Sequence, residues 1–167
     1  LNDNLIWIIS NLTDPLVPTA LKVVGYFRNS CDLKVLIALI APRLLDEQIE
    51  EALAIARSCE DVETRQFAIC KLLPYVREQD RHQIVTEALE ERQHLHSISR
   101  DVLLLELAPY LTGSNVQQTL ALIDQSVNFW PHYKLPLYIL LALAPNNLPT
   151  MLPAMIQVIR QKKSLHE

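Results

Sequence analysis

The chain has 167 residues, half of them hydrophobic, and a chain of this length can bury about two thirds of its unfolded surface in one or two domains. Only two glycines accompany ten prolines. Tight β-hairpins and phosphate-binding loops need glycine or asparagine where φ is positive, so the composition favours an all-α protein. The formal net charge of −4 lacks the basic stripe of a nucleic-acid binder, so direct nucleic-acid binding is disfavoured.

Ten helices are predicted, and prolines mark many of their boundaries. Pro15 and Pro18 suit the first turn of the second helix, where a missing N–H costs nothing. Pro42, Pro74 and Pro109 are each expected to stop a helix, because proline clashes with the preceding turn. In chain order the helices are expected over about residues 4–10, 15–28, 32–42, 46–59, 61–74, 80–93, 97–109, 114–127, 134–144 and 150–162.

Polar residues at helix starts and apolar residues at helical spacing predict the caps and the core. Asp46 and Asp61 suit the N-cap position, and either Ser97 or Ser99 would cap the seventh helix. Ser114 with Gln117 has capping-box spacing. The residues expected to point inward are Trp7, Leu21, Val23, Val24, Phe27, Ile49, Leu53, Ala56, Phe67, Ile69, Cys70, Leu72, Leu73, Ile84, Val85, Ala88 and Leu89. Those expected to face water are Glu87, Glu90, Glu91 and Arg92.

A regular spacing relates these helices to one another. The step is 11 residues from Ser10 to Leu21, from Pro42 to Leu53, from Pro109 to Leu120 and from Pro145 to Ile156, and it is 15 from Pro74 to Leu89. A period of 32 to 36 residues with two helices per unit is the signature of an α-solenoid, whose units bury their apolar faces by stacking. We therefore expect one all-α domain, a right-handed superhelix of about five helix pairs, with units at roughly residues 1–28, 32–58, 61–93, 97–127 and 133–163.

One unit carries a family resemblance. Residues 52–76 read ALAIARSCEDVETRQFAICKLLPYV and are echoed by LLELAPYL and LLALAP. This unit resembles the degenerate helix-turn-helix repeats, related to HEAT and TPR arrays, of bacterial multidomain signalling proteins. The resemblance covers roughly residues 1–160 and rests on hydrophobic spacing. It implies a sensor or partner-binding arm, because such arrays often lie beside a STAND-type nucleotide-binding module.

A charged pair in the same unit also resembles HEAT repeats. Asp61 and Arg65 match the aspartate and arginine that tie neighbouring HEAT units, and Arg100 stands at the same distance of nine residues before its proline. The matching positions in two other units are Leu33 and Pro136, so any arginine ladder is broken. The fixed Trp, Gly and Tyr of the TPR pattern are absent as well.

Motifs for catalysis, nucleotides and metals are missing. The chain contains none of the patterns G-x-x-x-x-G-K-[ST], G-x-G-x-x-G, G-x-S-x-G, C-x-x-C and H-E-x-x-H, so no catalytic residue, cofactor or metal site is predicted. The best metal candidate, His94 with His96, fits solvated loop histidines better than a ligand pair. Cys70 is expected in the core, while a reactive thiol stays open for Cys59 at a helix end.

Compartment signals favour the cytoplasm. Three cysteines are an odd number outside any dense framework, so reduced thiols are the simplest interpretation. No run of about eighteen apolar residues and no charged signal-peptide start occur, so no membrane partner is predicted. The chain begins at Leu1, almost directly in an apolar segment, and we therefore expect a piece of a longer protein.

Charged and aromatic residues supply the candidate partner sites. Residues 46–91 hold twelve acidic and five basic side chains, which are either solvated helix faces or an acidic groove for a basic protein or peptide. The second helix of each pair would line the concave surface, and the groove candidates there are Gln48, Glu51, Glu87, Glu91 and Gln118. An inserted aromatic loop would either anchor an interface or fold over the flanking helices, and its candidates are Phe129, Trp130, His132 and Tyr133.

Three classes of function follow from these patterns. The leading hypothesis is a non-catalytic protein-interaction or sensor module of a larger bacterial signalling protein. The second is homotypic assembly or a structural spacer, because the apolar last helix MLPAMIQVI makes a poor polar end for an array. A HEAT-like enzyme of the lyase or DNA glycosylase type would need a convergent polar pocket, and for DNA also positive charge, and the sequence predicts neither.

Overall fold

The computed structural model describes residues 3–112 and, beyond them, residues 115, 116, 119, 149, 152, 153 and 156. The chain divides into two compact units, residues 1–95 and residues 96–167. The described residues are helical and hold no β-strand, so the all-α prediction is confirmed for this part of the chain. The predicted Ser114 cap and the last three predicted helices fall mostly outside the described residues.

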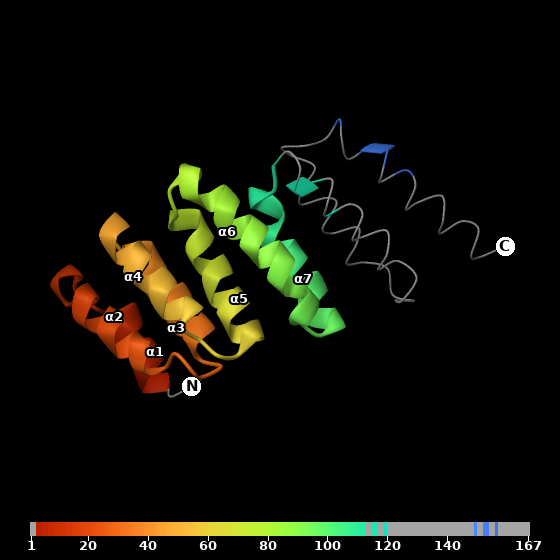
Figure 1. Cartoon of the computed structure of the whole chain (residues 1–167). Helices are drawn as coiled ribbons and strands as arrows, with labels where there is room; N and C mark the ends of the chain where they lie inside the picture. Colours follow the sequence, from red (N-terminus) through yellow and green to blue (C-terminus); the bar gives the residue numbers. More distant parts are fainter. Residues whose placement is uncertain are drawn as a thin grey trace. The chain divides into compact units, whose positions relative to one another are not determined.

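Seven α-helices and five short 3₁₀ turns (η) follow one another in the described residues, and Figure 1 labels the α-helices. In the first unit they are α1 (Asp3–Ser10), η1 (Asp14–Leu16), α2 (Val17–Tyr26), α3 (Leu33–Ile40), η2 (Ala41–Arg43), α4 (Asp46–Arg57), α5 (Val62–Leu72), η3 (Leu73–Tyr75), α6 (Glu78–Glu91) and η4 (Arg92–His94). In the second unit they are α7 (Ser97–Leu107) and η5 (Ala108–Tyr110).

Three prolines end their helices in the same way. Pro42, Pro74 and Pro109 each occupy the second position of a 3₁₀ turn that directly follows α3, α5 or α7. A proline lacks the N–H that would continue the α-helix, so the chain tightens into a short turn and stops. The residue after each turn is extended, with ψ of 141°, 141° and 128°. The predicted helix ends are therefore confirmed, and the joint that follows has one backbone geometry.

The predicted helix caps are right at α5 and wrong at α4. Asp61 caps α5, because its Oδ2 accepts a hydrogen bond of 2.7 Å from the Thr64 N–H. At α4 the N-cap residue is Leu45, and Asp46 lies in the first turn, where its charge still complements the helix dipole. The Gln48 side chain closes this end instead, and its Oε1 accepts a hydrogen bond of 2.9 Å from the Leu45 N–H.

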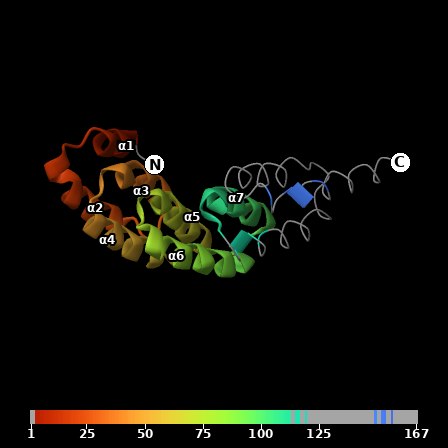
Figure 2. The ribbon, with the colours of Figure 1, turned by 90° about the horizontal axis from the view of Figure 1, so that it is seen from above.

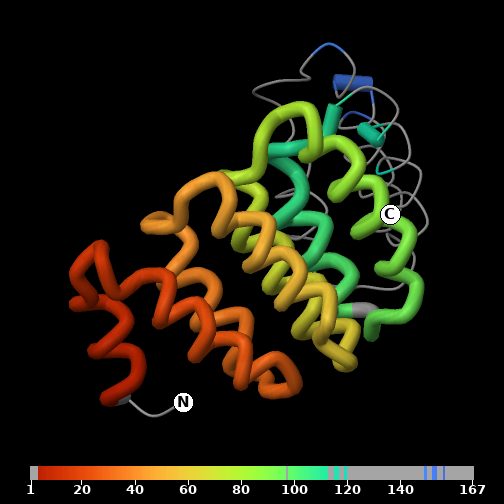
Figure 3. The backbone as a smooth tube through the Cα atoms, turned by 60° about the vertical axis from the view of Figure 1, so that its left-hand side comes forward, coloured from red at the N-terminus to blue at the C-terminus, as the bar shows by residue number. Residues whose placement is uncertain are grey.

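The helices of the first unit form two rows. α1 packs on α3 and α3 packs on α5, while α2 packs on α4. Contacts between α2 and α3 and between α4 and α5 join the rows. Figure 2 shows α2, α4 and α6 on one side of this unit and α1, α3 and α5 on the other, and the tube of Figure 3 follows the same succession.

The core of this unit is aliphatic. Leu21, Leu53 and Leu89, which the spacing places at the centre of the second helix of each pair, are at most 2% exposed. The other residues predicted to point inward from this unit are buried as well, except for three. Those three are Trp7, Val23 and Phe27. Burial of each large aliphatic side chain contributes roughly 1.5–3 kcal/mol, so this core is the main source of stability.

Trp7 is a wrong prediction, since its side chain is 68% exposed. α1 is only eight residues long and buries one side against α3, where Ile9 is 2% exposed. The indole lies on the other side, and Ile8 next to it is 49% exposed. An apolar segment therefore indicated a helix here, but not which of its sides is covered.

In the second unit, α7 repeats the apolar pattern of α5. Leu103, Leu104 and Leu107 are almost fully buried. The N-cap of α7 is His96, so neither Ser97 nor Ser99 is the cap residue that the sequence predicted.

Candidate functional site

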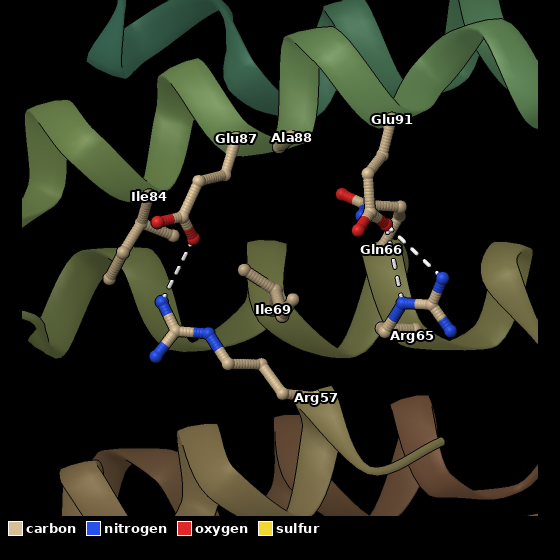
Figure 4. Close-up of a pocket in the computed structure, with 8 residues that line it drawn as sticks. All are labelled: Arg57, Arg65, Gln66, Ile69, Ile84, Glu87, Ala88 and Glu91. Carbon is tan, nitrogen blue, oxygen red and sulfur yellow. Dashed lines mark hydrogen bonds and ion pairs between the residues drawn. The ribbon is translucent and has the colours of Figure 1, made fainter. Parts of the chain in front are cut away.

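A polar pocket of about 300 Å³ lies in the first unit, at the C-terminal end of α4 and between α5 and α6 (Figure 4). Five polar side chains line it, namely Arg57, Arg65, Gln66, Glu87 and Glu91. Three apolar side chains complete the lining, namely Ile69, Ile84 and Ala88. A few convergent polar groups beside an apolar surface are the usual composition of a binding site.

Two ion pairs join the walls of this pocket. Arg57 Nη2 of α4 lies 3.0 Å from Glu87 Oε2 of α6. Arg65 of α5 donates from both Nε and Nη2 to Glu91 Oε2, at 3.2 Å each. The two glutamates are four residues apart on α6 and therefore share one helix face. Figure 4 shows the two pairs at opposite ends of the pocket, with Ile69 between them.

Gln66 is the most buried polar residue of the pocket, at 2% exposure. Its Nε2 donates a hydrogen bond of 2.5 Å to Glu91 Oε2. Its Oε1 is buried and has no hydrogen-bond partner in the structure. Turning the amide over would bring two oxygens together at Glu91, so the contact with the carboxylate fixes the orientation of the amide. A buried acceptor without a donor is uncommon in proteins, and it marks this wall of the pocket.

Arg65 also fastens the joint between α4 and α5. Its Nη1 donates to the carbonyl oxygens of Cys59 at 2.5 Å and Glu60 at 3.4 Å. One guanidinium thus contacts the end of α4, its own helix α5 and the carboxylate of Glu91 on α6. Asp61 has a different role, because it caps α5, and the hydrogen bonds from Thr64 lower the pKa of its carboxyl group.

The structure brings together two of the predicted groove residues and separates the others. Glu87 and Glu91 both line the pocket, and both are paired rather than fully solvated. Gln48 caps the start of α4, and Glu51 is exposed outside the pocket. The remaining candidates lie outside the described residues, and they are Gln118, Phe129, Trp130, His132 and Tyr133.

The sequence alone did not identify Gln66 as a site residue. It stands directly before the inward-pointing residues that begin at Phe67, so a polar side chain on a buried helix face was the only available signal. The contact between Arg57 and Glu87 spans 30 residues and could not be read from local spacing.

Much of the acidic charge of residues 46–91 has a structural role. Arg77 bridges two helices, with Nη2 3.7 Å from Glu50 Oε1 and Nε 3.1 Å from Asp80 Oδ2. Three further acidic residues lie in the first turns of α4 and α6, where the helix dipole favours negative charge, and they are Asp46, Glu47 and Glu78. Solvated faces and ion-paired walls both occur, and Glu87 and Glu91 are the acidic residues that line the polar pocket.

The cysteines and histidines supply no reactive centre in the described residues. Cys59 is 1% exposed, and burial raises the pKa of its thiol, which disfavours the nucleophilic thiolate. Cys70 is 3% exposed, as the sequence predicted. His94 and His96 are both exposed, and the described part of the chain holds no group of three or more His, Cys, Asp or Glu that could bind a metal ion.

A second hollow, of about 200 Å³, is almost entirely apolar. It lies along α1, η1 and α2, and its lining consists of Leu5, Ile8, Ile9, Leu12, Leu16, Thr19, Ala20 and Val23. Leu16 is 50% exposed and Val23 is 37% exposed. This apolar groove differs from the polar pocket in having no charged residue in its lining.

Comparison of the chain with protein-family models, curated proteins and solved structures finds no match. The described helices also include none with both the length and the apolar character needed to cross a lipid bilayer. Arguments about function therefore rest on the residues of the chain itself.

Proposed function

We propose that the chain is a right-handed α-solenoid of five helix pairs that serves as a non-catalytic interaction or sensor arm of a larger bacterial signalling protein in the cytoplasm. Its partner is a protein or a peptide. The polar pocket is the observation that carries this proposal, because it gives the helix pairs a hollow lined by Arg57, Glu87, Arg65 and Glu91. No catalytic residue is assigned.

The architecture is supported by recurrence within the described residues. The even-numbered helices α2 and α4 pack on one another, and so do the odd-numbered helices α1, α3 and α5. The proline turns after α3, α5 and α7 lead into joints of one geometry. Stacked helix pairs with one repeated joint are what a repeat array requires, and such arrays commonly bind partners along an extended surface.

A peptide selection tests the proposed function. Random peptides displayed on phage are selected against the chain, and the dissociation constants of the enriched peptides are measured by calorimetry. We expect the double exchange Arg57→Glu with Glu87→Arg to weaken binding about tenfold or more, because it preserves an ion pair but reverses the charge pattern at the pocket.

A matched control uses an ion pair outside the pocket. Exchanging Glu50 and Arg77 alters a pair of similar exposure that does not line the hollow, and it should leave peptide affinity unchanged. Failure to enrich any specific peptide, or equal weakening by both exchanges, would contradict the proposal.

Homotypic assembly is a second candidate, favoured by exposed apolar residues in both units. The first unit exposes Ile8, Leu16 and Val23 along the apolar groove, and the second unit exposes Leu152 at 52% and Ile156 at 40%. Unlike surfaces of this kind can join copies head to tail. Light scattering over a concentration series should then show growing particles for the chain and monomers for Ile8→Glu with Val23→Glu. A strict monomer at all concentrations argues against assembly.

A further inference from the structure

The oxygen atoms of the polar pocket provide unused hydrogen-bond acceptors. Gln66 Oε1 has no partner, although Gln66 is 2% exposed and lines the pocket. Glu91 accepts its hydrogen bonds from Arg65 and Gln66 on Oε2 alone, so its Oε1 takes part in none of them. A ligand that suits this wall must therefore donate hydrogen bonds, and a buried acceptor gains most from a donor that replaces water.

The apolar part of the lining suits an aliphatic stem. Ile69, Ile84 and Ala88 are at most 6% exposed and lie in the same hollow as the acceptor oxygens. Figure 4 shows Ile69 between the Arg57 end and the Glu91 end of the pocket. A chain of methylene groups can cover these side chains while its polar end reaches Gln66 and Glu91.

The surrounding charge favours a cation. Each arginine of the pocket is paired with one glutamate, and Arg65 also donates to two carbonyl oxygens at the end of α4. Residues 46–91 as a whole carry seven more acidic than basic side chains. An ammonium group is more compact than a planar guanidinium and offers three donors from one point.

We propose that this pocket receives the side chain of a lysine from a bound peptide, with the ammonium group donating to Gln66 Oε1 and Glu91 Oε1 and the methylene stem covering Ile69 and Ala88. The assignment rests on the proposed function, because it names the residue by which a peptide partner is recognised. It also gives Gln66 a role that packing alone does not explain.

Capped tripeptides test this assignment directly on the chain. The probe is acetyl-Ala-Lys-Ala-amide, followed through the backbone amide resonances of α5 and α6 in nitrogen-15 NMR spectra. The matched probes replace lysine by norleucine, by arginine or by ε-acetyl-lysine. We expect the lysine probe to bind about tenfold more tightly than the norleucine probe, and more tightly than the other two, because only it combines the stem with a compact charged donor.

A paired substitution locates the effect at the pocket. Gln66→Met removes the acceptor at nearly constant side-chain length, and Gln79→Met makes the same change at an exposed position of α6 outside the pocket. The first variant should lower the preference for lysine over norleucine at least threefold, and the second should preserve it. Thermal melting checks that both variants fold, and the probe comparison on the unaltered chain stands without them.

The results separate this inference from the proposed function. Equal binding of the lysine and norleucine probes, tighter binding of the arginine probe, or no resonance shift up to the solubility limit overturns the lysine assignment and indicates a pocket filled by water only. The proposed function would survive that result if the phage selection still enriches peptides that depend on Arg57 and Glu87. Absence of such peptides would overturn the proposed function itself.

Discussion

The junction between α2 and α4 and the junction between α4 and α6 are two successive steps along one row of helices, and they are built differently. Arg57 lies in the last turn of α4 and reaches Glu87 of α6. The position 32 residues earlier, in the last turn of α2, is Gly25. Ile55 Cδ1 of α4 lies 3.6 Å from where a Cβ on Gly25 would stand. The first junction is therefore a direct apolar contact, and the second is a pair of charges beside a pocket.

This difference shows how one repeated framework can present unlike surfaces. The buried leucine of α2 and that of α4 are equivalent in spacing and in burial, so the core of the two steps is the same. The residue at the end of the helix decides whether the next helix is met by an aliphatic side chain or across a polar hollow. Substitutions at matched positions can test the shared core and the differing junctions separately.

The largest expected effect concerns the shared core. Leu21→Ala and Leu53→Ala should each lower the free energy of unfolding by roughly 2–5 kcal/mol, because both leucines are at most 1% exposed and the change leaves a cavity. Denaturant titration measures both values. Leu45→Ala is the control, since Leu45 is 70% exposed and should lose almost nothing. A near-zero loss at either buried position would refute the equivalence of the two steps.

The next effect distinguishes the two ion pairs of the polar pocket. Glu91→Ala should cost about 1–3 kcal/mol, because Arg65 and the buried Gln66 both lose their acceptor. Glu87→Ala should cost at most about 1 kcal/mol, because Arg57 and Glu87 are both nearly half exposed. The same denaturant titration gives both numbers, and equal costs would mean that the Gln66 end is not the more buried part of the site.

A smaller effect compares the starts of α3 and α5. Asp61 is extended at ψ 113° and caps α5 through Thr64, whereas Asp32 is helical at ψ −19° and makes no side-chain cap bond to α3. Asp61→Ala should therefore cost about 1 kcal/mol, and Asp32→Ala should cost less.

The same cap predicts a dependence on pH. The pKa of Asp61 is lower in the folded chain than its ordinary value of 3.8, so the unfolded chain takes up the proton first. Stability from this cap is complete above the ordinary pKa and is lost as the pH falls through the folded pKa. Asp61→Asn retains capping near neutral pH but should remove this part of the acid sensitivity, as unfolding curves between neutral and acidic pH would show. An unchanged acid profile would assign the sensitivity to other carboxyl groups.

Much of the described fold could be predicted from sequence, and the pocket only in part. Proline positions and hydrophobic spacing gave the helix ends after α3, α5 and α7 and the buried leucines, because these depend on local backbone chemistry. Trp7 was misplaced because hydrophobicity does not reveal which side of α1 is covered. The predicted start of α6 was also late, since the helix begins at Glu78.

Side chains of the pocket depend on contacts across 25 to 30 residues, which spacing within one helix does not encode. Glu87 and Glu91 were found because they share a helix face and carry charge. Their partner Gln66 was missed, because a neutral residue beside a run of buried ones carries no distinctive pattern. The lysine-recognition proposal thus depends on a residue that only the three-dimensional arrangement identifies.

The smallest expected effect returns to Gly25. An alanine Cβ there would meet Ile55 at 3.6 and 3.8 Å, which is ordinary van der Waals contact, so the α2 to α4 junction has room for one methyl group. Glycine within a helix is less stable than alanine by about 0.5–1 kcal/mol, because it loses more conformational freedom on folding. Gly25→Ala should therefore raise the free energy of unfolding by a few tenths to about 1 kcal/mol, near the lower end because the residue lies in the last turn of α2. A longer side chain lacks that room, so Gly25→Leu should reverse the sign by pushing Ile55 away. If both substitutions stabilise the chain, α2 and α4 are not in direct contact at Gly25, and the contrast between the two junctions would have to be abandoned.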